Sequence, residues 1–255
     1  MKISWELAPI AHRGLHDADR GIVENSPAAV GAALASNFGI EVDLQISRDG
    51  VPMVFHDFTL ERLVNEAGPV RGRTARELTA LRYRSGSDTI MTLDDLLDTV
   101  DGRVPLYLEL KSNWSGDMAL AHAVAPGVNV YNGPLALMSF DPRMMRVART
   151  ACPGIPCGLV SGAYTNRAWD PGAGNAFSRF ALRHMLTAGI ARPSFINYDI
   201  SVISAWAPRL ARRLGFPVLT WTVRTPHDRK MAARWADAMV FEGFVPTDTE
   251  RGRLV

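Results

Sequence analysis

Residues 41–57 carry three chemically capable side chains that an ordinary hairpin would not need: Glu41, Asp43 and His56. The run resembles two apolar strands joined by Asp49-Gly50, a pair typical of hairpin turns because glycine readily adopts a positive φ. A turn centred on this pair would place Asp43 opposite His56, and Glu41 would share a face with Asp43 because side chains alternate along a strand. Exposed strand faces are commonly polar, so this pattern alone also fits a solvated surface.

A second informative run covers residues 103–111. Strand alternation there places Tyr107, Glu109 and Lys111 on one face and three leucines on the other. If the leucines face a layer of helices, a carboxylate and an ammonium remain at the end of the inner face. An apolar strand needs neither charge for packing, so the pattern indicates a site.

Strand-like and helix-like runs alternate along the whole sequence, which predicts parallel βα units. If residues 51–56 are the returning arm of the hairpin, eight strands remain, and eight close a (β/α)8 barrel. An open doubly wound sheet is the alternative, but no glycine-rich phosphate motif follows the first strand. The expected strands are 7–11, 41–46, 51–56, 103–111, 135–140, 156–160, 195–199, 217–223 and 238–241. The expected helices are 27–36, 92–100, 142–150, 176–188, 202–214 and 226–235.

Residues 58–89 have no strong periodicity and are long for a plain connection, so we expect a small cap inserted after the hairpin of the second strand. We expect residues 1–255 to form one barrel domain carrying this cap.

The net charge of +2 argues against nucleic acid as a partner, and a cluster of three arginines at 209, 212 and 213 fits a solvated helix face. No apolar run fits a signal peptide or a membrane span, which predicts a cytoplasmic protein without stable membrane insertion. The oligomeric state is left open.

Active sites of (β/α)8 barrels lie at the carboxyl ends of the strands. Charged or titratable pairs end three of the expected strands, and the hairpin arm returns His56 to the same rim. The pairs are His12 with Arg13, Glu41 with Asp43, and Glu109 with Lys111. Scattered surface charges would have no reason to gather in this way, so we expect one shared site.

The side-chain types divide by role. Three carboxylates, Glu41, Asp43 and Glu109, are hard oxygen ligands suited to one divalent cation, Mg²⁺ or Ca²⁺. Without a cation they would repel one another and raise one another's pKa. The remaining candidates are two phosphate-binding cations and two histidines for acid–base work. They are Arg13, Lys111, His12 and His56.

Trp221 faces the barrel mouth if Val223 does. It could then stack on a substrate, although core packing would explain it equally well.

The same residues, in order, resemble the glycerophosphodiester phosphodiesterase family. The matching elements are His12-Arg13-Gly14, Glu24-Asn25-Ser26, Glu41-x-Asp43, Asp49-Gly50, His56-Asp57 and Glu109-x-Lys111. The resemblance implies a (β/α)8 barrel with an inserted cap. It also implies hydrolysis of a small-molecule glycerophosphodiester to an alcohol and sn-glycerol 3-phosphate. The family's metal ligands match Glu41, Asp43 and Glu109, and its acid–base pair matches His12 and His56.

The sequence departs from the family in two places, which affects substrate choice. Residues 61–65 read Glu-Arg-Leu-Val-Asn where the family usually has an arginine followed by threonines. Glu242 follows the last strand where the family usually has Thr-Asp, and Thr247-Asp248 stands further on.

Two other functions fit the pattern. One is a lysophospholipase D-like or sphingomyelinase D-like phosphodiesterase acting on lipids, which needs an apolar approach surface that residues 58–89 do not show. The other is a catalytically silent phosphodiester-binding protein, against which the pair of histidines argues, because binding alone requires no proton transfer. The sequence leaves open the head group, the metal, the roles of the two histidines, and whether water or a substrate hydroxyl attacks.

Overall fold

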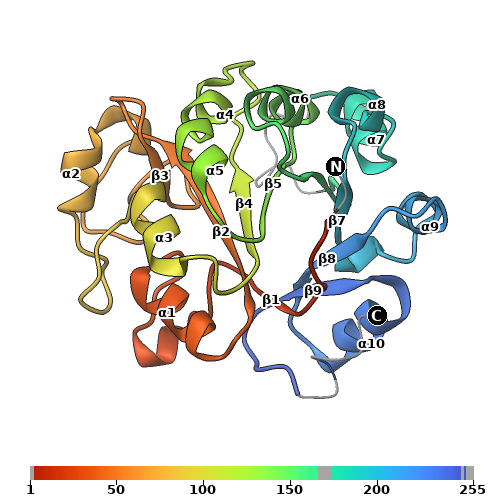
Figure 1. The fold of residues 1–255 in the computed structure, drawn as a ribbon, viewed down its shortest axis with the longest axis horizontal. Helices are drawn as coiled ribbons and strands as arrows, with labels where there is room; N and C mark the ends of the chain where they lie inside the picture. Colours follow the sequence, from red (N-terminus) through yellow and green to blue (C-terminus); the bar gives the residue numbers. More distant parts are fainter. Residues whose placement is uncertain (1–2, 166–173, 248–249, 251–255) are drawn as a thin grey trace.

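The computed structural model describes residues 3–165, 174–247 and 250, and its centre is a closed barrel of eight parallel strands (Figure 1). The barrel closes because β1 pairs with both β2 and β9, through Ile10–Gly39 and Ile10–Val240. The strands are β1 Ile10–Ala11, β2 Gly39–Ile46, β4 Leu106–Leu110, β5 Leu135–Ser139, β6 Cys157–Ser161, β7 Phe195–Asp199, β8 Val218–Val223 and β9 Ala238–Phe241. This architecture confirms the expected (β/α)8 barrel.

The ninth strand, β3 (Pro52–Val54), returns antiparallel along the end of β2, as the hairpin pattern predicts. The predicted register was wrong by one residue: Leu44 pairs with Val54, so Asp43 lies beside Phe55 and not His56. The cause is a three-residue loop, 48–50, in which Gly50 adopts a φ of +84°. Loops of this kind place glycine in the left-handed region after a type I turn.

Helices follow the strands around the barrel, and their starts are set by local capping. Ser26 caps α1 (Pro27–Ala35), and Thr92 forms a capping box with Asp95 at α3 (Leu93–Val100), both as expected. The other predicted helices that formed are α6 Pro142–Ala151 and α10 Pro226–Trp235, while α4 Ala119–Ala123 and α5 Ala125–Val130 were not predicted. Within the described ranges, no helix combines the length and apolarity needed to cross a membrane.

Two helix predictions require correction. The run 176–188 forms α7 (Ala176–Arg183) and α8 (Ala188–Ala191), separated at Met185, whose φ is +54°. The run 202–214 forms a 3₁₀ turn, η3 (Ile200–Val202), followed by α9 (Trp206–Arg213). The later start places Pro208 in the first helical turn, where no backbone N–H is required for an intrahelical bond.

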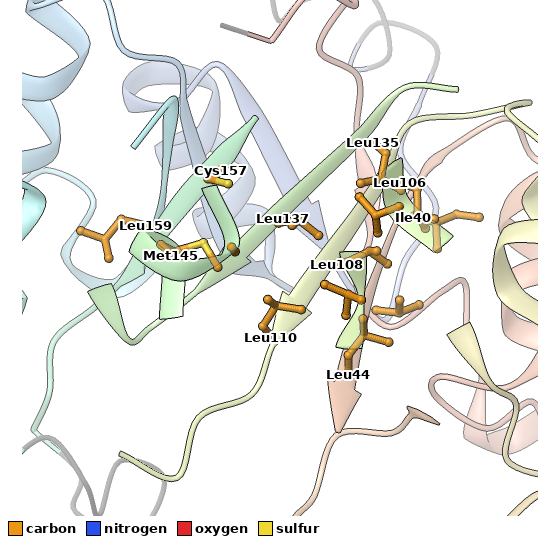
Figure 2. Packing of buried hydrophobic residues seen from close by; sticks show 14 of the residues in the cluster. Ile40, Leu44, Leu106, Leu108, Leu110, Leu135, Leu137, Met145, Cys157 and Leu159 are labelled. Carbon is orange, nitrogen blue, oxygen red and sulfur yellow. The ribbon is translucent and has the colours of Figure 1, made fainter. Parts of the chain in front are cut away.

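The alternation along β4 divides the core as predicted. Leu106, Leu108 and Leu110 belong to the cluster between barrel and helices, and Figure 2 shows them among the side chains of the neighbouring strands. Tyr107 points the other way, into a cluster inside the barrel that includes Phe195. That interior is tightly filled: a Cβ at Gly158 would lie 2.3 Å from the Phe195 ring.

Residues 58–89 are packed and not a loose connection. They contain η2 (Val70–Gly72) and α2 (Ala75–Thr79), and in Figure 1 α2 lies outside the barrel beside β3. Their buried apolar side chains form a separate cluster with Ile90 and with two side chains from the hairpin arm. The cluster consists of Met53, Phe55, Leu60, Val64, Val70, Leu78, Tyr83 and Ile90.

Candidate active site

A cavity of about 780 Å³ opens at the carboxyl ends of the barrel strands. Seven of the eight predicted site residues line it: His12, Arg13, Asp43, His56, Glu109, Lys111 and Trp221. The eighth, Glu41, is buried with its carboxylate close to those of Asp43 and Glu109. The structure therefore brings together at one place the side chains that the strand-end rule selected.

The three carboxylates form a compact buried triad. Glu41 and Asp43 share one face of β2, and Glu109 is the register partner of Asp43 on β4. One oxygen from each residue lies within 4.8 Å of the others. Burial, together with the neighbouring Asp43 and Glu109, raises the pKa of Glu41 well above its usual range. A further positive charge would hold this carboxylate ionised, and oxygen donors suit a hard divalent ion, so the triad fits one.

Lys111 neutralises part of the triad. Its Nζ donates to Glu109 Oε1 at 2.6 Å and lies 3.0 Å from Asp43 Oδ1. Burial alone would raise the pKa of Asp43, but Lys111 and the nearby cations outweigh it and hold that pKa well below its usual range. Asn25 completes the shell of Asp43 by donating from Nδ2 to Oδ2 at 2.9 Å and accepting the Asp43 N–H at 3.1 Å.

Arg13 is held by acidic groups on several sides. Its backbone, with φ of +56°, donates an N–H to Glu41 Oε2 at 3.0 Å. Its guanidinium donates from Nη1 to Glu24 at 2.6 Å, and its Nε lies 3.3 Å from Asp43. Arg13 also lines the cavity, and among the described residues no side-chain hydrogen bond from its Nη2 is found.

His12 ends β1 with its ring fixed by a carboxylate. Its Nδ1–H donates to Glu242 Oε2 at 2.7 Å, and its Nε2 lies 3.9 Å from Glu41. Burial lowers the pKa of His12 to about 4, despite its hydrogen bond to Glu242. Burial alone would raise the pKa of Glu242. The hydrogen bond from His12 and the nearby Arg224 outweigh burial and lower this pKa to about 2. Glu242 is therefore an acceptor only, which sets the tautomer of His12.

His56 has a matching carboxylate partner. Its Nδ1–H donates to Asp57 Oδ1 at 2.6 Å, and Arg62 donates to both oxygens of Asp57. Arg62 also donates to both oxygens of Glu24, which in turn accepts from Arg13. A continuous chain of ion pairs thus ties the His56 side of the cavity to the Arg13 side.

Sequence reasoning missed three of these residues as parts of the site: Glu24, Arg62 and Glu242. Glu242 directly follows β9, so the strand-end rule applied to the last strand would have found it. Glu24 and Arg62 lie on connections, and the sequence pattern shows no periodicity that would pair them. Asp248, which follows Thr247 at the place where the sequence departs from the family after the last strand, lies outside the described residues.

Trp221 both packs and lines the cavity. Its Nε1–H donates to the carbonyl of Ser161 at 3.3 Å, and its ring meets that of Phe140 edge-on at 5.3 Å and 88°. Phe58 and Trp114 line the same cavity. The lining of the cavity therefore includes an aromatic surface as well as the two histidines, Asp43 and Glu109.

Comparison with known proteins agrees with this geometry. The model of the glycerophosphoryl diester phosphodiesterase family matches residues 12–247. YhdW of Bacillus subtilis, whose name places it among the glycerophosphodiester phosphodiesterases, is 25% identical over 92% of each chain. A phosphodiesterase of Oleispira antarctica, solved in complex with the product sn-glycerol-3-phosphate, superposes with a TM-score of 0.74 at 21% identity, covering 92% of this chain and 93% of that one. The glycerophosphodiester phosphodiesterase of Thermotoga maritima gives 0.68 at 20% identity, covering 93% and 95%. The chain therefore belongs to the glycerophosphoryl diester phosphodiesterase family and is a phosphoric diester hydrolase.

Proposed function

We propose that the enzyme hydrolyses glycerophosphodiesters to an alcohol and sn-glycerol 3-phosphate, with one divalent cation, Mg²⁺ or Ca²⁺. The observation that carries the proposal is the convergence of two carboxylate-bound histidines and a buried carboxylate triad on one cavity. Membership of the family supports it, as does the glycerol-3-phosphate bound to the Oleispira relative.

Glu41, Asp43 and Glu109 are the residues that would hold the cation. When bound, it would polarise the phosphoryl oxygens and neutralise the charge that develops during transfer. Lys111 and Arg13 add fixed positive charge beside the same carboxylates. A planar guanidinium edge suits two phosphate oxygens, whereas the ammonium acts as a point charge.

His12 and His56 move the protons. Each ring commits Nδ1 to a carboxylate, which leaves Nε2 for the substrate. One histidine takes a proton from the attacking hydroxyl, and the other gives a proton to the departing alkoxide. Glu242 and Asp57 orient the rings and stabilise the imidazolium that forms in turn.

A second candidate function has one observation in its favour. The aromatic wall formed by Phe58, Trp114, Phe140 and Trp221 offers apolar surface to a lipid chain. A lysophospholipase D-like or sphingomyelinase D-like activity on lysophospholipids or sphingolipids would use that wall. Turnover of lysophosphatidylcholine without turnover of glycerophosphocholine would favour this candidate.

We further propose that residues 1–255 act as one catalytic unit with 58–89 as its cap. The separate packing of that segment and the position of Phe58 at the cavity wall support this division. The cytoplasmic location stays a prediction.

The direct test measures release of sn-glycerol 3-phosphate from glycerophosphocholine. The purified enzyme is assayed after treatment with a chelator, and again after Mg²⁺ or Ca²⁺ is returned. We expect turnover to stop with the chelator and to recover with one of the ions. Full turnover in the presence of the chelator would contradict the metal dependence, and release of choline phosphate alone would contradict the assigned bond cleavage.

A further inference from the structure

The exposed apolar side chains of this enzyme are concentrated on one flank of the barrel. Eleven large hydrophobic residues are exposed in the described ranges, and eight of them lie between Phe177 and Phe216, on or beside α7, α8 and α9. Phe177, Leu214 and Leu186 are 74%, 67% and 58% exposed. Figure 1 places these three helices on the same side of the barrel. Patches of this kind mark interaction sites when they are rimmed by polar groups.

An apolar groove of about 420 Å³ runs along this flank between α8 and α9. Met185 and Ala188 line one wall, and Trp206, Leu210 and Leu214 line the other. His184 stacks on Trp206 at 5.3 Å with an interplanar angle of 14°, so the aromatic rim of the groove is ordered by its own contacts. None of these residues takes part in the proton-transfer or metal-binding groups described above.

The opposite face of α9 is strongly basic. Arg209, Arg212 and Arg213 surround a second hollow, of about 240 Å³, together with Arg234 and Trp235 of α10. The guanidiniums of Arg209 and Arg234 lie 4.9 and 4.8 Å from the centre of the Trp235 ring. Arg212 pairs with Asp237, but the other three arginines have no ion-pair partner in the described parts of the chain.

The charge of the flank differs from that of the whole chain. Residues 174–216 contain six arginines and one acidic residue, a balance of +5, whereas the entire sequence carries only +2. The single acid, Asp199, lines the catalytic cavity and so does not offset the arginines on the outer surface. Any partner of this flank must therefore offer negative charge and apolar surface side by side.

We infer that α9 and its two flanking hollows form a docking surface for an anionic phospholipid membrane. Phosphate head groups match the arginine cluster, and the acyl boundary matches the groove and its protruding side chains; helices that lie in the membrane interface combine these two features. A second copy of this chain would bring two arginine clusters together, and a nucleic acid would leave the groove without a partner. The association is peripheral and reversible.

The position of α9 links this surface to the active site. Ile200 and Ser201 of η3 line the catalytic cavity, and Trp206, a few residues later in the chain, lines the groove. Docking through α9 therefore brings the rim of the cavity beside the lipid surface. Substrates that form by deacylation of membrane lipids, or that remain in the bilayer, would meet the enzyme there.

The test is co-sedimentation of the full chain with vesicles, which requires no catalysis and so is independent of the proposed reaction. Vesicles of phosphatidylcholine alone are compared with vesicles containing phosphatidylglycerol, at low and high salt. The variants are Arg209→Gln with Arg213→Gln, and Leu214→Gln. Their controls are Arg20→Gln with Arg76→Gln, which remove equal charge from exposed sites elsewhere, and Val130→Gln, at a side chain 82% exposed on α5. Thermal melting verifies that each variant is folded.

We expect binding to the anionic vesicles only, weakened by salt. Loss of the two arginines should reduce the partition coefficient by about fivefold or more, and Leu214→Gln should reduce it by about tenfold. The control variants should bind like the wild type. Absence of binding to anionic vesicles would overturn the inference, as would binding that Leu214→Gln leaves unchanged, which would show adsorption by charge alone. A dimer that Leu214→Gln dissociates would assign the surface to a second copy of the chain. Saturable binding of an acidic amphipathic peptide, without binding to vesicles, would assign it to another protein. Either result would also overturn the inference.

Discussion

The imidazole of His12 donates from Nδ1 to Glu242 Oε2 at 2.7 Å, across 230 residues of sequence. The bond joins the end of β1 to the residue that follows β9, so barrel closure itself fixes the histidine. It commits one ring nitrogen and turns the other toward the carboxylate triad, where Nε2 lies 3.9 Å from Glu41. Glu242 thus fixes the orientation of the His12 ring.

The Glu242 pairing predicts a pH-dependent contribution to stability. The pKa of Glu242 is about 2 in the folded chain, against an ordinary value of 4.5. A carboxyl whose pKa is lowered on folding stabilises the fold fully above its unfolded pKa, and loses this effect as the pH falls through the folded pKa. Glu242→Gln should lower the free energy of unfolding by about 1–3 kcal/mol at neutral pH. The difference from the wild type should shrink as the pH falls from 4.5 toward 2.

Urea unfolding of both proteins between neutral pH and pH 3 checks this prediction. Glu6→Gln, at an exposed acid with no such partner in the described structure, is the matched control and should show no difference at any pH. A Glu242→Gln deficit that stays constant down to pH 3 would exclude the assigned pairing.

Arg62 should support catalysis without touching the substrate. It binds both oxygens of Asp57 and both of Glu24, so its removal frees the partner of His56 and one partner of Arg13. Arg62→Ala should lower kcat by about tenfold or more, in line with the loss of other supporting contacts in active sites. KM should change less, and Arg62→Lys should recover part of kcat. Steady-state kinetics, with Arg76→Gln as the control, provides the measurement. An unchanged kcat in Arg62→Ala would show that Arg62 does not support catalysis.

Cation binding to the triad should release a proton. Burial and two neighbouring carboxylates raise the pKa of Glu41, so a divalent ion must displace the proton that Glu41 holds below that pKa. Calorimetric titration with Mg²⁺ or Ca²⁺ in buffers of different ionisation enthalpy should show this release, with an affinity that weakens as the pH falls. Glu41→Gln should abolish binding, whereas Glu6→Gln should not. Tight binding to Glu41→Gln would place the ion elsewhere.

Packing inside the barrel gives a stability prediction that does not depend on the chemistry. Gly158→Ala should lower the free energy of unfolding by about 1–3 kcal/mol, because a new Cβ would lie 2.3 Å from the buried Phe195 ring. Gly189→Ala in α8 is the control, since a Cβ there has no neighbour within 4 Å and alanine favours helix. Denaturant unfolding of both variants checks this; equal stabilities would contradict the packing.

Features of the fold and the candidate site that depend on short-range sequence patterns could be predicted from the sequence. Alternation along β4 predicted that Glu109 and Lys111 face inward, and the rule that barrel sites lie at strand ends then gathered residues from three strands and the hairpin. Ser26 and Thr92 predicted helix starts because a cap requires only the next three residues.

What depends on exact backbone geometry or on distant pairs could not be predicted. One additional residue in the loop after β2 moved Asp43 opposite Phe55, because glycine at position 50 suits either a two-residue or a three-residue loop. The bonds from Glu242 to His12 and from Arg62 to Glu24 join segments that only the closed barrel brings together. The docking surface around α9 could not be predicted from the sequence either. Its arginines resemble an ordinary solvated helix face, and only the structure shows the apolar groove beside them.

The central claim is that His12 and His56 transfer protons at one phosphodiester site. The most direct measurement is the rate of sn-glycerol 3-phosphate release from glycerophosphocholine by the wild type, His12→Ala, His56→Ala and the exposed control His122→Ala, each verified as folded by thermal melting. We predict that kcat falls by about 10²–10⁴-fold in each of the first two variants and stays at the wild-type value in the third. Turnover within a few-fold of the wild type in either His12→Ala or His56→Ala would contradict the claim.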